Sequence, residues 1–320
     1  MPRFQPKIFA CLPPLLLLAC GTEPPGDADT STAERRPNVL LIVVDDMGYN
    51  EIGAFGSEIE TPNLDQLAFG GLRFTNFHAA PVCAPARAML LSGTSNHQAG
   101  VGSMTIKRAY DFGRAPDPDA LGFGLPGYVG HLSDRVAALP EILQAAGYHT
   151  YMTGKWDLGR ALEDTHMPAR RGFESSFILT TGAAVHLSFP DRNASGGLSR
   201  ADSYPYQENG LPVTELPEDF LSTMMYTDKL IEYIDENAGD GRPFFAWLSY
   251  TAPHWPIQVP DDWRDRYAGR YDEGYEIIRD RRFARAQELG IFSADLDLSR
   301  YDAGAEDWNA LGDDERREQS

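Results

Sequence analysis

A cysteine at the expected start of a helix is the residue of this sequence most clearly placed to take part in a reaction. Cys83 is followed by Pro85, which suits the first turn of a helix, and by helix-forming residues 86–91 that stop before Gly93. Unpaired backbone N–H groups and the helix dipole favour a tetrahedral oxyanion at such a place, and Arg87 would add a forked donor one turn on. A buried free cysteine without a chemical role is the alternative that residue type alone favours. Other parts of the chain must decide between the two.

Two adjacent carboxylates follow a strongly apolar segment. Residues 38–44 are a continuous β-branched and aliphatic run, typical of a parallel strand buried on both faces, and Asp45 and Asp46 come directly after it. Neighbouring strand side chains diverge, so both can reach one point only if the chain turns after Val44, which Gly48 permits. Hard oxygen ligands that converge there would suit Ca²⁺ or Mg²⁺. Capping of a turn is the commoner use of such a pair and stays open.

Charged side chains also follow two further expected strands. Residues 149–153 are expected as one strand and precede Lys155 and Asp157, and residues 244–250 are expected as another and precede His254. Because ligands of open parallel sheets bind beyond the carboxyl ends of the strands, these groups are expected on one rim with the pair of aspartates. The histidine, taken alone, is more simply explained as a structural residue.

The elements that must carry these residues alternate between strands and helices. Apolar residues at helical spacing predict a helix over residues 139–146 and another from about 219 to 237. Such alternation is typical of an α/β domain with parallel strands. The Gly- and Pro-rich stretch from 101 to 131 is expected as a substrate-facing loop, and residues 184–216 as a long surface excursion.

The composition describes a globular chain with an acidic surface. The 320 residues are 42% hydrophobic, which is enough for one large α/β domain or two small ones. A formal net charge of −19 argues against nucleic acid as a partner, since it repels a polyanion and offers no basic stripe. An anionic substrate would therefore have to be attracted by a local cluster, for which Arg87 and Lys155 are candidates.

The amino-terminal segment is expected to lie outside the folded domain, residues 37–320. Residues 1–20 place basic residues before an apolar run too short to span a bilayer, as in a signal peptide, and residues 21–36 have the composition of a disordered tether. The run ends in Leu-Leu-Ala-Cys-Gly, which resembles a bacterial lipobox, so Cys20 is the expected lipidation site and the cell envelope the expected location. Plain cleavage near that point, giving a periplasmic or secreted protein, is the alternative. Either way Cys83 has no disulfide partner inside the folded chain.

Six segments form a joint pattern that is more specific than any one of them. They are Pro37-Asn38-Val39-Leu40 through Asp45-Asp46, Thr61-Pro62-Asn63-Leu64-Asp65, Phe74-Thr75-Asn76-Phe77-His78, Cys83-Ala84-Pro85-Ala86-Arg87 with Leu91-Ser92-Gly93, Gly154-Lys155-Trp156-Asp157-Leu158-Gly159 and Ala252-Pro253-His254-Trp255-Pro256. In order and spacing they resemble the type I sulfatases of the alkaline phosphatase superfamily over most of residues 37–311. The resemblance implies an α/β fold with a mixed, mainly parallel central sheet flanked by helices. It also implies an arylsulfatase-like sulfuric ester hydrolase that releases sulfate from a small alcohol or phenol ester.

The resemblance also implies roles for the matching residues. In the family, a maturation enzyme oxidises the cysteine at the position of Cys83 to formylglycine, whose hydrate attacks sulfur with one hydroxyl and later expels sulfate by re-forming the aldehyde. Arg87 would steady the formylglycine, and Lys155 would contact the sulfate and offset its developing negative charge. His254 would donate to the sulfate or protonate the leaving oxygen.

A divalent cation is the second group that the resemblance implies. Asp45, Asp46 and the formylglycine at position 83 would hold Ca²⁺, with Mg²⁺ as the alternative, and the cation would bind sulfate oxygens. Family members continue past this chain into an Asp-Asn pair that completes the calcium shell and a second sulfate-binding lysine. The expected domain is therefore the amino-terminal catalytic part only. A truncated, non-catalytic sulfatase-like lipoprotein and a related phosphomonoester or phosphonate hydrolase are the alternative functions, although the cysteine favours sulfate.

One residue departs from the family pattern. Asp157 stands where the family motif Gly-Lys-Trp-His-Leu-Gly has an active-site histidine, and its side chain should point the same way as that of Lys155. A carboxylate about 4 Å from a sulfate, at an effective dielectric constant of about 20, costs on the order of 4 kcal/mol. Asp157 is therefore expected to weaken ester binding. Pairing with Lys155 and action as a base are the alternatives.

Overall fold

The computed structural model describes residues 36–104, 107, 109, 115–159, 166–187, 205–298 and 308–319. The expected signal peptide, Cys20 and all of the expected tether except Arg36 lie outside these residues. Within the described ranges, no helix has the length and apolar character that crossing a bilayer requires.

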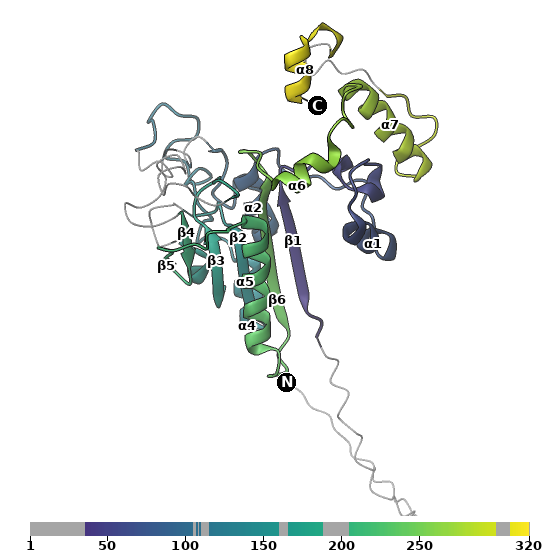
Figure 1. Ribbon diagram of the computed structural model, residues 1–320. Helices are drawn as coiled ribbons and strands as arrows, with labels where there is room; N and C mark the ends of the chain where they lie inside the picture. The colour runs from purple at the N-terminus through teal and green to yellow at the C-terminus, as the bar shows by residue number, and fades with distance from the viewer. Residues whose placement is uncertain are drawn as a thin grey trace, which may run out of the picture. The chain divides into compact units, whose positions relative to one another are not determined.

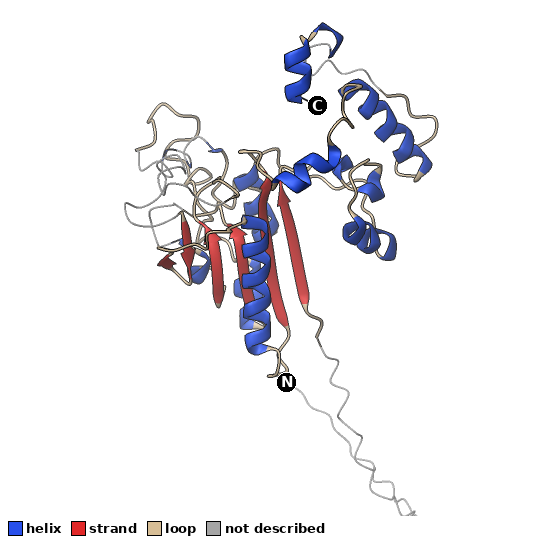
Figure 2. Ribbon diagram, viewed as in Figure 1, coloured by secondary structure: helices blue, strands red, loops and turns tan. Residues whose placement is uncertain are grey.

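Six strands form one mixed sheet in the order β1-β6-β2-β3-β4-β5 (Figures 1 and 2). The pairs β1–β6, β6–β2 and β2–β3 are parallel, and the pairs β3–β4 and β4–β5 are antiparallel. The mainly parallel sheet predicted from the sequence is confirmed. The strands are β1 (Val39–Asp45), β2 (His149–Lys155), β3 (Ser175–Leu179), β4 (Tyr206–Glu208), β5 (Leu211–Pro212) and β6 (Phe244–Pro253).

Helices flank this sheet, as the alternating pattern predicts. The helix expected after Cys83 is present and ends at a glycine, Gly93, with φ of 64°. The described helices are α1 (Pro62–Gly70), α2 (Cys83–Ser92), α4 (Leu139–Ala145), α5 (Ser222–Asn237), α6 (Asp261–Arg264), α7 (Tyr275–Glu288) and α8 (Asp313–Gln319). Short 3₁₀ turns lie at Tyr49–Glu51, Gly53–Phe55, Pro168–Arg170, Asp265–Tyr267 and Trp308–Ala310.

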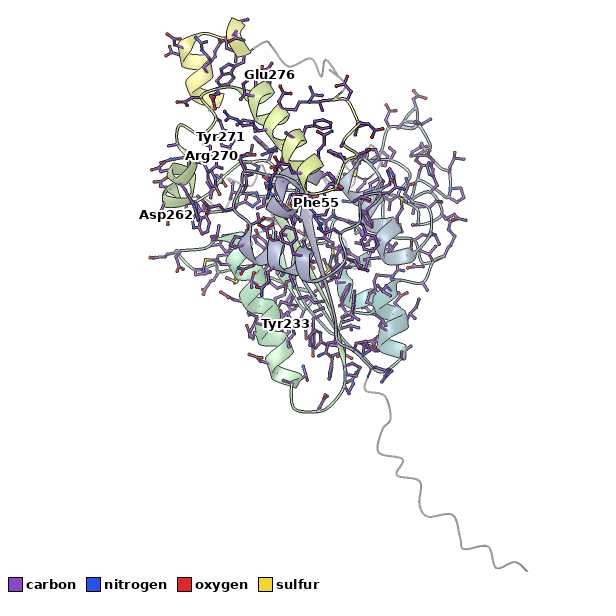
Figure 3. The ribbon with its side chains drawn as sticks, turned by 90° about the vertical axis from the view of Figure 1, so that its right-hand side faces the viewer. Phe55, Tyr233, Asp262, Arg270, Tyr271 and Glu276 are labelled. Carbon is purple, nitrogen blue, oxygen red and sulfur yellow. The ribbon has the colours of Figure 1, made fainter. Side chains whose placement is uncertain are left out.

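Two apolar clusters pack against opposite faces of the sheet. Successive residues of β6 alternate between them, because strand side chains point to opposite faces: Phe245 and Trp247 join the cluster of α2 and α4, whereas Ala246 and Leu248 join that of α5. Tyr233, labelled in Figure 3, lies on the buried face of α5. The central strands are therefore covered on both sides, which leaves the carboxyl ends of the parallel strands as the place for polar chemistry.

The first strand is less covered than its sequence predicts. A strand buried on both faces was the expectation for residues 38–44, but Leu40 is 53% exposed and Ile42 is 39% exposed. Within the described residues, β1 stands at one edge of the sheet and pairs with a single strand, β6. An apolar run reports that a strand can be buried, whereas its position in the sheet decides whether it is.

Residues 188–204 of the expected surface excursion lie outside the described residues, but the part that follows them belongs to the sheet. This part contributes β4 and β5 to the edge of the sheet, and Tyr206 is almost fully buried against Phe177. Two short antiparallel strands of this kind lack the long apolar run by which a strand is recognised in sequence.

Two local backbone features bring the parallel strands to a common rim. The register between β1 and β6 shifts after Val44, so that Asp45 lies opposite Pro253 and next to His254. In β2, Gly154 has φ of 97°, and a Cβ atom there would lie 1.9 Å from the carbonyl oxygen of Ser249. Only glycine fits this approach of β2 to β6, directly before Lys155.

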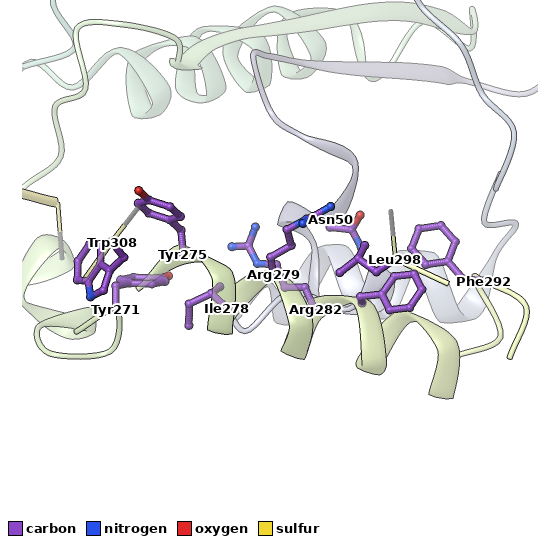
Figure 4. Close-up of a pocket in the computed structure, with 10 residues that line it drawn as sticks. Asn50, Tyr271, Tyr275, Ile278, Arg279, Arg282, Phe292, Leu298 and Trp308 are labelled. Carbon is purple, nitrogen blue, oxygen red and sulfur yellow. The ribbon is translucent and has the colours of Figure 1, made fainter. Parts of the chain in front are cut away.

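A separate cavity lies along α7, away from the residues selected by the sequence analysis. Its volume is about 510 Å³, and Asn50, Tyr271, Arg282, Phe292 and Trp308 are among its lining residues (Figure 4). Arg282 of α7 forms ion pairs with two carboxylates of the segment after β1. Its Nε lies 2.6 Å from Oε2 of Glu58, and its Nη1 lies 2.8 Å from Oε1 of Glu51. Figure 3, which labels Phe55 and Tyr271, shows the side chains of this region.

Candidate active site

The carboxyl ends of β1, β2 and β6 meet at one rim of the sheet, because the three strands run parallel (Figures 1 and 2). Asp45 ends β1, Lys155 ends β2, and His254 follows Pro253 at the end of β6. Cys83 begins α2, as expected. The structure therefore brings together elements that are far apart in the sequence.

Arg87 connects α2 to two of these strands. Its side chain is buried, and Nη1 donates to the backbone carbonyl of Lys155 at 2.9 Å and to the hydroxyl of Ser249. Nη2 lies 3.4 Å from Oδ1 of Asp45. Within the described part of the chain, Nε and Nη2 make no hydrogen bond. A buried guanidinium with two unused donors is suited to an additional anionic acceptor.

Lys155 and Asp45 form an ion pair beside this arginine. Lys155 is fully buried, Asp45 is nearly so, and Nζ contacts Oδ2 of the carboxylate. Lys155 was expected to contact the sulfate and Asp45 to hold a cation. In the structure the two side chains pair with each other, and burial makes an unpaired charge at either position costly.

Asp46 turns away from Asp45. The turn expected at Gly48 is made by Asp46 itself, which has φ of 64°, whereas Gly48 is extended with φ of −71°. Aspartate is among the few residues other than glycine that tolerate this left-handed conformation. The Asp46 side chain is largely exposed, and its Oδ2 lies 3.7 Å from Nε2 of His254.

The imidazole of His254 lies at the edge of this arrangement. Its Nδ1 is 2.6 Å from the carbonyl oxygen of Trp255, so that Nδ1–H donates to the backbone. Nε2 is then the ring nitrogen that faces Asp46. A hydrogen bond that fixes one ring nitrogen leaves the other for proton transfer.

The described residues do not assemble the expected cation site. In the ranges that the structure covers, no group of three or more His, Cys, Asp and Glu side chains converges to hold a metal ion. Asp45 is engaged by Lys155 and Arg87, and Asp46 points to His254. Two diverging carboxylates fit a divalent cation poorly, because Ca²⁺ takes six to eight oxygen ligands.

Asp157 is fully buried and has two cationic neighbours. Nζ of Lys107 lies 2.9 Å from its Oδ1, and Nζ of Lys155 lies 3.9 Å from its Oδ2. The thiol of Cys83 lies close enough to interact electrostatically with the same carboxylate. Asp157 therefore faces the site with Lys155, as expected, but its charge is compensated. Pairing with Lys155 was the alternative left open by the sequence, and the closer partner in the structure is Lys107.

Lys107 is the site residue that sequence reasoning missed. It lies in the stretch expected as a substrate-facing loop, and no family motif covers it. Its ammonium group is fully buried. The sequence offered one signal for it: lysine is rare in this chain, and residues 37–320 contain only three. A buried lysine against a buried aspartate is a tertiary pairing that no local spacing encodes.

Electrostatics favour a charged aspartate and an uncharged thiol. Burial acts to raise the pKa of Asp157, but the charges of Lys107, Lys155 and Arg87, with the hydrogen bond from Cys83, lower it below its usual value. Burial raises the pKa of the Cys83 thiol to about 11, and the negative charge of Asp157 adds to the effect. Unmodified Cys83 is consequently a poor nucleophile near neutral pH.

Comparisons with known proteins agree with this geometry. The Sulfatase family model matches residues 37–307. An uncharacterized sulfatase of Schizosaccharomyces pombe is 41% identical over 88% of this chain and 50% of its own length, and an arylsulfatase of Klebsiella aerogenes is 39% identical over 89% and 57%. Among solved structures, Ps i-CgsB in complex with k-i-k-neocarrahexaose is similar with a TM-score of 0.59 and 27% identity over 79% of this chain and 54% of that one.

The chain spans about half the length of these curated relatives. The match nevertheless begins where β1 does and includes Cys83, Arg87, Lys155 and His254. The chain belongs to the sulfatase family.

Proposed function

We propose that this protein hydrolyses small sulfate esters in the manner of an arylsulfatase. The observation that carries the proposal is the set of buried cations beside Cys83: Arg87 and Lys155 lie at the same rim, and Arg87 keeps two buried N–H groups without a hydrogen bond in the described chain. Fixed donors in a water-excluded site stabilise the charge of a sulfuryl group far better than donors in water do. The 39% identity to an arylsulfatase supports the same reaction class.

Conversion of Cys83 to formylglycine is part of this proposal. The spacing to Pro85 and Arg87 matches the family motif, and the thiol itself, with a pKa of about 11, is unsuited to act as a nucleophile. When hydrated, the aldehyde supplies a hydroxyl nucleophile and a second hydroxyl from which the aldehyde re-forms. Asp157, whose negative charge acts on the side chain at position 83, would orient such a group.

The chain's own residues divide the remaining work. Arg87 and Lys155 would bind sulfate oxygens, and the rigid attachment of Arg87 to the ends of β2 and β6 pre-orients its donors. His254 would carry a proton on Nε2 to the leaving oxygen, since Nδ1 is held by the carbonyl of Trp255. Oδ2 of Asp46 lies 3.7 Å from Nε2.

A divalent cation, Ca²⁺ or Mg²⁺, is the part of the family pattern that the described residues support least. Asp45 is paired with Lys155, and Asp46 lies beside His254. No step of the proposed reaction is therefore assigned to a cation.

Export and lipid anchoring at Cys20 complete the proposal, and they rest on the sequence of residues 1–36. Expression in a bacterial host, followed by membrane fractionation and mass spectrometry of the mature amino terminus, tests them. A lipid-bearing Cys20 in the membrane fraction is expected. An unlipidated amino terminus near residue 20 in the soluble fraction would favour the periplasmic or secreted alternative.

The enzymatic proposal is tested by co-expression with a formylglycine-generating maturation enzyme. Peptide mass spectrometry should find the aldehyde at position 83, and hydrolysis of 4-nitrophenyl sulfate should follow it and be absent in Cys83→Ala. Preferential hydrolysis of 4-nitrophenyl phosphate would make the protein a phosphomonoester hydrolase. Complete conversion of Cys83 with no turnover of either ester would favour the non-catalytic alternative.

A further inference from the structure

Five buried charged side chains form one cluster around Cys83. Lys155 contacts Asp45, Arg87 lies beside Asp45, and Lys107 contacts Asp157, which also faces Lys155. All five are at most 5% exposed. Counted over these five described side chains, the cluster holds three positive and two negative charges, an excess of one positive charge.

Lys107 decides the sign of this cluster. Without it, the charges of Lys155 and Arg87 would only balance those of Asp45 and Asp157. An incoming sulfate would then bind at a site with no net charge and with a carboxylate beside position 83. With it, the carboxylate is neutralised at 2.9 Å and a positive charge remains for the anion. The molecule as a whole carries −19, so this local excess is what can attract an anionic ester.

The same lysine also fixes where the carboxylate lies. Asp157 follows the end of β2 in a left-handed conformation, with φ of 53°, and its oxygens point at Lys107 on one side and Lys155 on the other. In this orientation its negative charge acts on the side chain at position 83. A buried ion pair that loses one partner leaves an uncompensated charge, which is costly and draws the remaining groups into new positions.

We propose that Lys107 is a positioning residue of the sulfate site: acting through Asp157, it holds the carboxylate against position 83 and supplies the excess positive charge that admits an anionic ester. The inference rests on the proposed function and adds a specificity-determining pair to it. Asp157 stands where the family motif has histidine, so Lys107 is the compensation that makes a carboxylate tolerable there.

The test measures binding of inorganic sulfate by isothermal titration calorimetry, on protein with unmodified Cys83. Lys107→Met should weaken sulfate binding at least tenfold, because it makes the cluster neutral. Lys107→Arg should stay within about threefold of the wild type. The double variant Lys107→Met with Asp157→Asn removes one charge of each sign, restores the excess positive charge, and should regain most of the lost affinity.

Lys229→Met is the matched control. Lys229 also forms an ion pair of 2.9 Å, with Glu208, but it lies on α5 and faces the other side of the sheet. Its substitution should leave sulfate affinity unchanged. Urea unfolding of every variant separates lost affinity from lost structure, and rescue by the double variant is an effect that a merely structural lysine would not show.

Three results would overturn the inference: no measurable sulfate binding by the wild type, unchanged binding by Lys107→Met, or a double variant no better than Lys107→Met. Failure of the proposed function is distinguishable from these. If the wild type binds sulfate and the variants follow the expected order, while the aldehyde-bearing protein does not hydrolyse aryl sulfates, the charge-setting role of Lys107 stands and the proposed activity falls.

Discussion

Cys83 lies in surroundings that suppress ordinary thiol chemistry. Partial burial, the charge of Asp157 and a hydrogen bond to that carboxylate all favour the neutral thiol, and they outweigh the cation of Lys155 and the positive end of the helix dipole. If Cys83 is oxidised enzymatically as proposed, a low reactivity towards other electrophiles would protect it until then. The same burial keeps an oxidised side chain away from bulk water.

Alkylation should report this suppression directly. With a pKa of about 11, Cys83 should react with iodoacetamide at pH 8 roughly 100-fold more slowly than a free thiol, and its rate should rise tenfold per pH unit up to at least pH 9.5. Asp157→Asn should lower the pKa and speed the reaction. Asp134→Asn, a change at an exposed carboxylate, should not.

The readout is mass spectrometry of the peptide that contains Cys83, since the chain has three cysteines. A rate that levels off below pH 9 would contradict the expectation and would mean that the lysines, not the carboxylates, dominate the thiol.

The carboxylates of this rim should bind Ca²⁺ weakly. Asp45 is held by Lys155 and Arg87, and Asp46 points elsewhere, so calorimetry should give a dissociation constant in the millimolar range, about 10⁻³ M. Lys155→Met should tighten binding by freeing Asp45, and Lys229→Met should have no effect. Submicromolar binding by the wild type would be incompatible with the side-chain arrangement described.

Elements, and not only residues, hold the site together, and Gly154 shows how narrowly. The close approach of β2 to the carbonyl of Ser249 leaves no room for a side chain, one residue before Lys155. Gly154→Ala should therefore lower the free energy of unfolding by at least about 3 kcal/mol. Gly210→Ala is the control, because Gly210 has a similar φ of 83° and no atom within 4 Å of the new Cβ.

Chemical denaturation monitored by circular dichroism measures both variants. Backbone strain alone should cost the control about 1–2 kcal/mol. Equal losses in the two variants would show that β2 and β6 can separate without penalty.

The attachment of α7 should depend on pH. Burial acts to raise the pKa of Glu58, but hydrogen bonds from Arg282 and Tyr271 lower it below its usual value. The pair therefore contributes stability above pH of about 4.3, the unfolded value, and loses it as pH falls through the lowered folded pKa. Arg282→Met should cost about 1.5 kcal/mol at pH 7 and less at pH 3.

Arg281 gives the comparison on the same helix. It pairs with Glu273, and both side chains are more than half exposed. Arg281→Met should change the free energy of unfolding by less than about 0.5 kcal/mol at either pH. A loss as large as that of the Arg282 variant would remove the special role of the buried pair.

The sequence predicts the elements that local patterns encode. The run after Asn38, the helix between Cys83 and Gly93 and the strand before His254 were confirmed, because apolar periodicity, proline and glycine act over a few residues. The charged residues at strand ends were gathered on one rim, since parallel strands carry their carboxyl ends to the same edge. Features that depend on tertiary contacts were not predicted. They are the exposure of β1, the short strands β4 and β5, and the burial of Lys107, all of which depend on neighbours distant in sequence.

Along the whole molecule, an acidic surface borders an uncovered apolar strand. Leu40 and Ile42 alternate along the exposed face of β1, and an edge strand offers unpaired backbone groups to another chain. The net charge of −19 opposes such contact by repulsion. Salt screens that repulsion, so association between chains should increase with ionic strength.

Light scattering tests this expectation on the 37–320 segment. The mean molecular mass should increase as sodium chloride is raised from about 20 to 300 mM. Over this range the Debye length falls from roughly 20 Å to below 10 Å. Leu40→Lys should reduce the increase, with an unchanged free energy of unfolding. Leu211→Lys, at an exposed leucine of the two-residue strand β5, should not reduce it. A monomer at every salt concentration would show that the β1 edge is already protected.

Arg87 joins these scales, because one guanidinium ties α2 to the carbonyl that ends β2 and to the hydroxyl of Ser249 on β6. Selection for folding alone would preserve it in a descendant that had lost all catalysis. Cys83, Asp46 and His254 hold much less of the fold together and would be free to drift in such a lineage. In related sequences, the presence of these three residues would therefore be the better marker of an active enzyme. A sequence that keeps the arginine but has replaced the three residues would encode a protein that has lost catalysis.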